Sequence, residues 1–175
     1  MATMILLPDA DGTVSSDWIP VGETGAYNCL DDDNDGTSYV KSSTNLASMI
    51  IEFANPSVAE ADRDSIASVR FLSSGKAVHR TNPSVVDIAF EAPAGVSAYS
   101  EAASYNAHRT AFETINGTAR TTSDGSTAWT YSDLEGLELE CIKNATIEVY
   151  LSYLALEVTY TAASADNATF FGANF

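Results

Sequence analysis

The chain has 175 residues, and its 24 acidic residues against eight Lys and Arg give a formal net charge of −16. This length suits a single domain that buries its own core without a metal or a disulfide. Nucleic acid and anionic membranes bind cationic surfaces, so the charge excludes both as expected partners.

The first segment, residues 1–8, contains the short apolar run Met4, Ile5, Leu6 and Leu7. No basic residue precedes this run, and it is shorter than the roughly seven to fifteen apolar residues of a secretory signal. No other stretch approaches the roughly 18 apolar residues of a membrane span. We therefore expect synthesis and folding in a cytoplasm, with residues 1–8 forming an N-terminal arm or a first strand.

An acidic run follows at residues 31–36, with the sequence DDDNDG. Asp31, Asp33 and Asp35 match the opening of a calcium-binding loop, in which alternate oxygens converge on the cation. The bidentate Glu that should end such a loop is missing, because Ser42 takes its place. We therefore expect a solvated acidic loop and no cofactor, with a calcium ion kept as the alternative.

Period-two alternation marks most of the predicted strands. In residues 84–91, Val86, Ile88 and Phe90 fall on one face, while Asp87 and Glu91 fall on the other. The other predicted strands cover residues 38–41, 49–53, 66–72 and 137–141. The run 146–161 is dense in β-branched and aromatic residues on both faces, which predicts a long central strand.

Turn dipeptides separate these runs, among them Asp11-Gly12, Asn82-Pro83 and Asp124-Gly125. About eight short strands with regular turn signals predict an all-β fold, an antiparallel jelly-roll-like sandwich over residues 9–161. Extended arms are expected at both ends.

The last segment, residues 162–175, is expected to be a C-terminal arm. It carries Phe170, Phe171 and Phe175, and three exposed phenylalanines on a free tail would be costly in water. We therefore expect this tail to dock on its own domain or on a neighbouring molecule.

Cys29 and Cys141 lie far apart in the sequence. In a reducing compartment both are expected to be small buried residues, although a bridge between them stays possible.

No motif of known chemistry indicates an enzyme. The only histidines are His79 and His108, and the chain has no nucleophile elbow, no zinc-binding histidine pair and no cysteine pair at zinc-ligand spacing. We therefore predict no catalytic residue. Aromatic residues such as Trp18, Trp129, Tyr131 and Tyr153 could stack on sugars, but core packing is the favoured interpretation for the two tryptophans.

Lysine is scarce, with only Lys41, Lys76 and Lys143. A surface that is rich in acids and poor in lysine repels itself at low ionic strength and is screened in concentrated salt. A halophilic source is a hypothesis from this composition.

The order of several short segments resembles that of small jelly-roll-like structural proteins of tailed phages and archaeal tailed viruses. The segments are residues 7–12, 18–20, 27–31, 35–40, 67–71, 128–137 and 156–160. The resemblance spans residues 6–160 and implies a virion component, such as a capsid decoration protein or a part of the tail. This chain departs from that pattern in its acidic run at residues 31–35 and in its aromatic tail.

Residues and resemblance together predict a non-enzymatic virion structural protein, made in the host cytoplasm. Its most favoured role is a capsid decoration (cement) protein that binds and stabilises neighbouring capsid subunits. The expected partners are the major capsid protein or other virion subunits and further copies of itself, a trimer by resemblance. Partner contacts are predicted at Met4, Ile5, Leu6, Leu7, Phe170, Phe171 and Phe175. The alternative is a tail- or fibre-associated module, or a β-sandwich that binds a carbohydrate or receptor.

Overall fold

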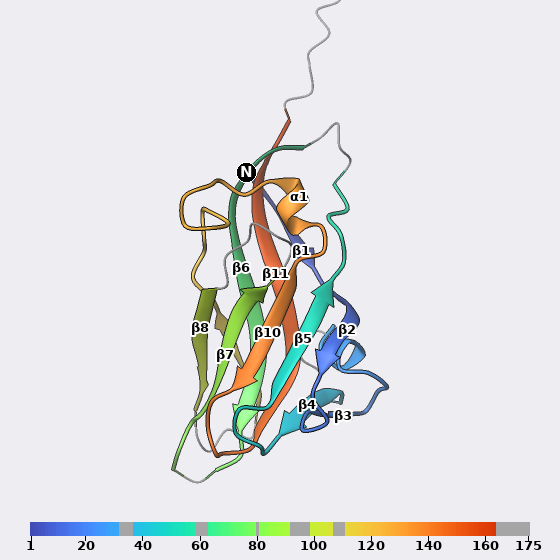
Figure 1. Cartoon of the computed structure of the whole chain (residues 1–175), viewed down its shortest axis with the longest axis vertical. Coiled ribbons are helices and arrows are strands. Elements are labelled where there is room, and N and C mark those ends of the chain that lie inside the picture. Colours follow the sequence, from blue (N-terminus) through green and yellow to red (C-terminus); the bar gives the residue numbers. More distant parts are fainter. Residues whose placement is uncertain (32–36, 59–62, 80, 92–98, 107–110, 164–175) are drawn as a thin grey trace, which may run out of the picture.

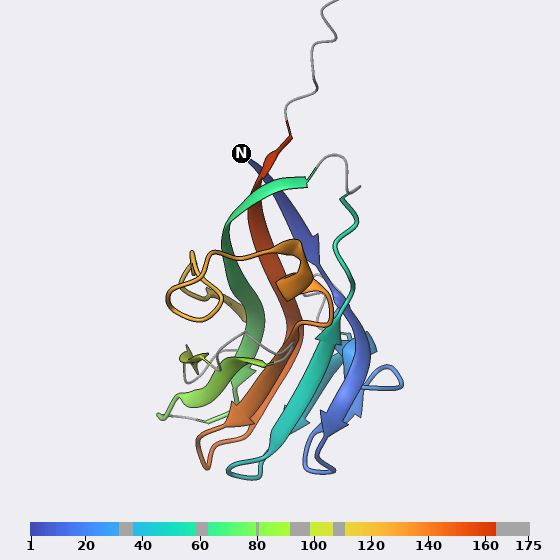
Figure 2. The same ribbon diagram turned by 45° about the horizontal axis from the view of Figure 1, so that its top comes forward.

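The computed structural model of the chain describes residues 1–31, 37–58, 63–79, 81–91, 99–106 and 111–163. Two antiparallel sheets pack face to face, so the predicted jelly-roll-like β-sandwich is confirmed (Figures 1 and 2). Sheet A contains, in spatial order, β3 (Ile19–Val21), β4 (Tyr39–Ser42), β11 (Val149–Ala162), β6 (Arg63–Ala77) and β9 (Glu113–Asn116), with β1 (Ala2–Leu6) also paired to β11. Sheet B contains β2 (Pro8–Val14), β5 (Ser48–Phe53), β10 (Glu138–Lys143), β7 (Ser84–Glu91) and β8 (Tyr99–Tyr105).

The described residues form eleven strands, where about eight were predicted. Of the two alternatives expected for residues 1–8, the structure has the first strand, β1, which pairs with β11. The strands that the sequence pattern missed are β2, β3, β8 and β9. β2 begins at a proline and contains Gly12, and β8 is rich in Ala and Ser, so both lack the β-branched and aromatic residues that strands prefer. The described residues also form two short helices, η1 (Tyr27–Cys29) and α1 (Tyr131–Leu134).

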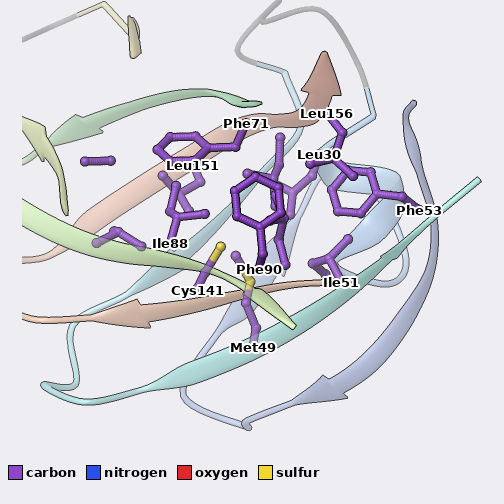
Figure 3. Close-up of a cluster of buried hydrophobic side chains, with 14 of the residues drawn as sticks. Leu30, Met49, Ile51, Phe53, Phe71, Ile88, Phe90, Cys141, Leu151 and Leu156 are labelled. Carbon is purple, nitrogen blue, oxygen red and sulfur yellow. The ribbon is translucent and has the colours of Figure 1, made fainter. Parts of the chain in front are cut away.

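The predicted alternation in β7 and β10 is confirmed by burial. Val86 and Ile88 of β7 and Leu139 and Cys141 of β10 are fully buried between the sheets, whereas Glu138 lies on the outer face. Figure 3 shows this core, to which both sheets and the loop residue Leu30 contribute. Burial of so many apolar side chains in one cluster is the main source of stability in a domain of this size.

The two longest strands, β6 and β11, lie side by side along the long axis of the molecule (Figure 1). β11 is the centre of sheet A, because it pairs with β4 and β6 at its beginning and with β1 and β6 at its end. The long central strand predicted over residues 146–161 is therefore found, as β11.

The sheets approach closely at Gly75 of β6. A Cβ atom placed there would lie 2.7 Å from the Tyr105 ring and 2.8 Å from the Leu151 side chain. Only glycine lets the ring of Tyr105 cross this strand, so Gly75 is required by packing rather than by backbone conformation.

The two cysteines are buried and unbridged. Burial raises the pKa of the Cys141 thiol, so this group stays protonated and unreactive inside the core. Among the described residues, no helix is long and apolar enough to cross a membrane.

Candidate functional site

The predicted N-terminal contact residues lie on and beside β1, which is a paired strand of sheet A. Leu6 is buried in the core of this chain, and Met4 is half-buried and packs against that core. Ile5 is 44% exposed and Leu7 is 39% exposed, so of these four residues only Ile5 and Leu7 present largely exposed apolar side chains to solvent. Successive side chains of a strand point to opposite faces, which explains why Met4 and Leu6 face the core while Ile5 and Leu7 face solvent.

Several predicted site residues lie outside the described part of the chain. These are Phe170, Phe171 and Phe175 in the tail and Asp33 and Asp35 in the acidic run. His108, for which no site role was predicted, also lies outside the described residues. Asp31 is described and half-buried. Within the described residues, no group of three or more His, Cys, Asp or Glu side chains could hold a metal ion.

The two tryptophans are core residues. Trp18 is 2% exposed and Trp129 is 3% exposed, which confirms the core packing that the sequence favoured. The indole N–H of Trp129 donates to the Arg120 carbonyl at 3.0 Å, and its ring lies 6.0 Å from that of Phe90. Neither tryptophan can stack on a sugar from solvent.

His79 has a local role in a turn. Its Nδ1 accepts hydrogen bonds from the backbone N–H groups of Thr81 at 3.2 Å and Asn82 at 3.1 Å.

A group of aromatic and basic side chains gathers on the outer face of sheet A. We call it the tyrosine surface, and it consists of Tyr39, Lys41, Lys76, Phe112, Tyr150 and Tyr153. All six side chains are half-buried, and they come from the neighbouring strands β4, β11 and β6 and from the residue that precedes β9.

The strand register places Tyr150 at the centre of this surface. Tyr150 of β11 lies opposite Lys41 of β4 on one side and opposite Lys76 of β6 on the other. The following residue, Leu151, is fully buried, as is its β4 partner Val40. Because side chains alternate along a strand, Tyr150 and both lysines point away from the core.

An irregularity in β11 adds a second tyrosine to the same face. The register shifts between Leu151 and Tyr153, so that Ser152 is an extra residue and Tyr153 lies opposite Ser74. Without this bulge, residues three apart would point to opposite faces. With it, Tyr150 and Tyr153 both face outward.

The aromatic rings lie close enough to support one another. The ring centroids of Tyr39 and Tyr150 are 5.0 Å apart with a 50° tilt, and those of Tyr39 and Phe112 are 6.3 Å apart with a 46° tilt. Tilted pairs at such distances are favourable and restrict ring rotation. The three rings therefore form a stable apolar platform.

Two polar contacts complete the platform. The Lys76 ammonium lies 4.3 Å from the centroid of the Phe112 ring and 5.4 Å from that of Tyr150, which is a favourable cation–π arrangement. A hydrogen bond to the Glu148 carboxylate raises the pKa of Tyr150 to about 12, so its hydroxyl stays protonated at neutral pH.

An ion pair lies further along the outer face of the same sheet. The Arg70 Nε lies 2.7 Å from the Glu157 Oε1, and Ile5 of β1 lies opposite Glu157 on the other side of β11.

The outer face of sheet B has the opposite character. Glu138 of β10 lies opposite Glu52 of β5 and Glu91 of β7, so three carboxylates form a row across the sheet. Partial burial and the charges of Glu52 and Glu91 raise the pKa of Glu138. Such a row repels anions and offers no apolar platform, so the tyrosine surface is the stronger candidate for a binding site.

Sequence reasoning identified Tyr153 as a possible sugar-stacking residue but missed Tyr39, Phe112 and Tyr150. Tyr39 and Tyr150 lie far apart in the sequence, and only the pairing of β4 with β11 brings them together. The density of aromatic residues in residues 146–161 is the one available signal, and it predicts a long central strand but not an exposed platform.

No family model and no curated protein matches this chain. Among solved structures, the chain is similar to the CBM22-1 xylan-binding domain of Paenibacillus barcinonensis Xyn10C, with 10% identity, a TM-score of 0.48, and coverage of 91% of this chain and 95% of that domain. It is also similar to a family 16 carbohydrate-binding module, with 10% identity and a TM-score of 0.38. That match covers 80% of this chain and 84% of the module. A third neighbour is the enzymatically active domain of bacteriophage CBA120 tailspike protein 4, with 10% identity and a TM-score of 0.42, where the match covers 90% of this chain and 19% of that one. At these values the likeness does not establish a shared ligand.

Proposed function

We propose that this chain is a non-enzymatic β-sandwich that binds carbohydrate at the tyrosine surface. The observation that carries the proposal is the platform of Tyr39, Tyr150 and Phe112, whose rings lie 5.0 Å and 6.3 Å apart on the outer face of a sheet. Because two of the rings stand on paired strands, the platform needs little ordering when a ligand arrives.

The chemistry of a sugar ring fits such a platform. The face of a pyranose carries C–H groups and is apolar, so it packs against the faces of aromatic rings, while hydroxyl groups project from its edge. The Lys76 ammonium and the Tyr150 hydroxyl lie at the rings and offer polar partners to those hydroxyls. An aromatic platform with a few polar groups beside it is the usual composition of a small-molecule site.

A glycan array tests this proposal with the wild-type chain and the Tyr150→Ala variant. We expect the wild type to bind at least one glycan class and Tyr150→Ala to lose that binding while it remains folded. Tyr160→Ala is the matched control, because Tyr160 is also a half-buried tyrosine of β11 but lies near the other end of the strand. A wild type that binds no glycan, or a Tyr150→Ala variant that binds like the wild type, would refute the proposal. Recovery of the glycan in cleaved form would refute the non-enzymatic part.

The second candidate is a virion structural role, in which the chain decorates a capsid or belongs to a tail or fibre. The exposed apolar side chains of Ile5 and Leu7 support it, because apolar groups left in water at a chain end are suited to contact with a neighbour. The test is assembly of particles with Ile5→Ser and Leu7→Ser together, or with residues 162–175 deleted. The capsid role predicts lower occupancy or lower heat stability of the particles. Full occupancy with both changes would exclude it.

A further inference from the structure

We propose that the carbohydrate bound at the tyrosine surface is acidic, and that Lys41 and Lys76 receive its carboxylate groups. This inference rests on the proposed function and names the class of glycan. It predicts a preference for uronate-containing chains over neutral ones.

The first observation is where the lysines lie. The chain has three lysines, and the two that flank Tyr150 in the strand register are Lys41 and Lys76. The third, Lys143, is buried and donates a hydrogen bond to the Ala145 carbonyl. Every lysine that this chain can offer to a ligand therefore lies on the tyrosine surface.

The second observation is that neither lysine has a charge partner among the described residues. In the described part of the chain, neither Lys41 nor Lys76 has a carboxylate within 4.0 Å, although the full sequence has 24 acidic residues. Arg70 on the same outer face is paired with Glu157 at 2.7 Å. Among the described residues, an acid of this chain therefore neutralises Arg70 on this face but not the two lysines beside the aromatic rings.

The third observation is that Lys76 is already positioned. Its ammonium lies over the Phe112 ring, 4.3 Å from the ring centroid, and over the Tyr150 ring, 5.4 Å from that centroid. A uronate ring stacked on the part of the platform that Lys76 leaves open would carry its carboxylate at the ring edge, within reach of the ammonium that lies over the rings. Charge-assisted hydrogen bonds to carboxylates are about twice as strong as neutral ones, so such a contact would select the acidic sugar.

One group on the surface opposes this preference. The Glu148 carboxylate accepts a hydrogen bond from the Tyr150 hydroxyl and therefore lies next to the platform. It would repel an acidic ligand, as would the net charge of −16, although screening limits both effects to about 8 Å at physiological ionic strength. Glu148→Gln keeps a hydrogen-bond acceptor and removes the charge, so this variant should bind an acidic glycan more tightly and a neutral one equally.

The experiment compares acidic polymers with their own neutral forms. Isothermal titration measures the folded chain against polygalacturonate and alginate, and against the same two polymers after reduction of their carboxyl groups to alcohols. We expect at least one acidic polymer to bind about tenfold more tightly than its reduced form, because a charge-assisted bond is lost on reduction. Lys76→Gln should abolish most of that difference and Lys41→Gln should reduce it. Arg70→Gln is the matched control, because it removes a cation of the same face that is already paired with Glu157, and it should leave the preference unchanged.

The outcomes separate the inference from the proposed function. If the reduced polymers bind as tightly as their acidic parents, or if the preference survives Lys76→Gln, the inference is wrong while carbohydrate binding stands. If neither acidic polymer binds, the inference is also wrong, and the glycan array then decides whether neutral sugars bind through Tyr150. Only the absence of every Tyr150-dependent interaction on that array removes the proposed function itself.

Discussion

The Tyr105 hydroxyl of β8 donates a hydrogen bond to the Ser73 hydroxyl of β6 at 2.8 Å and so joins the two sheets inside the core. Ser73 in turn donates to the Ile115 carbonyl of β9 at 3.3 Å. Burial raises the pKa of Tyr105, which keeps its hydroxyl protonated as a donor. These side chains form a short hydrogen-bonded chain from sheet B to the edge strand of sheet A.

The two ends of that hydrogen bond should respond differently to mutation. Ser73→Ala leaves the buried Tyr105 hydroxyl without its acceptor, which should cost about 1–3 kcal/mol of unfolding free energy. Tyr105→Phe removes the donor but leaves Ser73 bound to Ile115, so it should cost about 0.5–1.5 kcal/mol. Urea denaturation measures both, with Ser104→Ala on the exposed side of β8 as the control. A larger loss in Tyr105→Phe than in Ser73→Ala would contradict this description of the core.

The carboxylate row on sheet B should make stability depend on pH. The pKa of Glu138 is raised in the folded chain, so the folded state holds this proton more tightly than the unfolded state does. The free energy of unfolding therefore falls as the pH rises from about 4.3, the pKa of Glu in an unfolded chain, through the raised pKa of Glu138 in the folded chain.

Glu138→Gln removes this repulsion. It should raise the unfolding free energy by about 0.2–1 kcal/mol at pH 7, and the gain should disappear below about pH 4, where the carboxyl groups are protonated in both states. Urea denaturation at the two pH values measures the difference. The control is Glu23→Gln, an exposed acid for which no effect is expected. An equal gain at both pH values would show that charge repulsion is not the cause.

The net charge of −16 should make the fold more stable in concentrated salt. Screening weakens the repulsion among the acidic side chains of the folded chain, where they are closer together than in the unfolded chain. The midpoint of thermal unfolding should therefore rise as NaCl increases from low to molar concentration. A flat or falling midpoint would count against both this mechanism and the halophilic hypothesis.

The thiols of Cys29 and Cys141 should be inaccessible in the folded protein. Both are buried and free, and burial raises the pKa of the Cys141 thiol. A thiol reagent should therefore react slowly in buffer and rapidly with two groups in urea without a reductant. Fast reaction of the folded chain would show that the reagent reaches the core. If no thiol reacted in urea without a reductant, the two cysteines would be bridged.

The fold could be predicted from the sequence where one face of a strand is buried. The alternation in residues 84–91 matches β7 (Ser84–Glu91) at both ends, because Val86, Ile88 and Phe90 all enter the core. The pattern fails for β8, where Ala102 and Ala103 differ in burial but not in residue type. Such strands are defined by their neighbours rather than by their own residues.

The tyrosine surface could not be predicted for a related reason. The bulge at Ser152 changes which residues of β11 face outward, and no pattern in residues 146–161 marks its position. Phe112 joins the surface because β9 pairs with β6, a contact between segments about 40 residues apart. Sequence alone showed an excess of aromatic residues there, whereas their assembly into one platform is a property of the sheet.

The most direct test of the central claim is the location of a bound glycan. Backbone amide chemical shifts of the labelled chain can be followed during titration with the tightest ligand from the array. Binding at the tyrosine surface predicts that the largest changes fall on β4, on β11 around Tyr150, on β6 around Lys76 and on Phe112. Changes confined to the outer face of sheet B, or to the other end of β11 around Tyr160, would contradict the account.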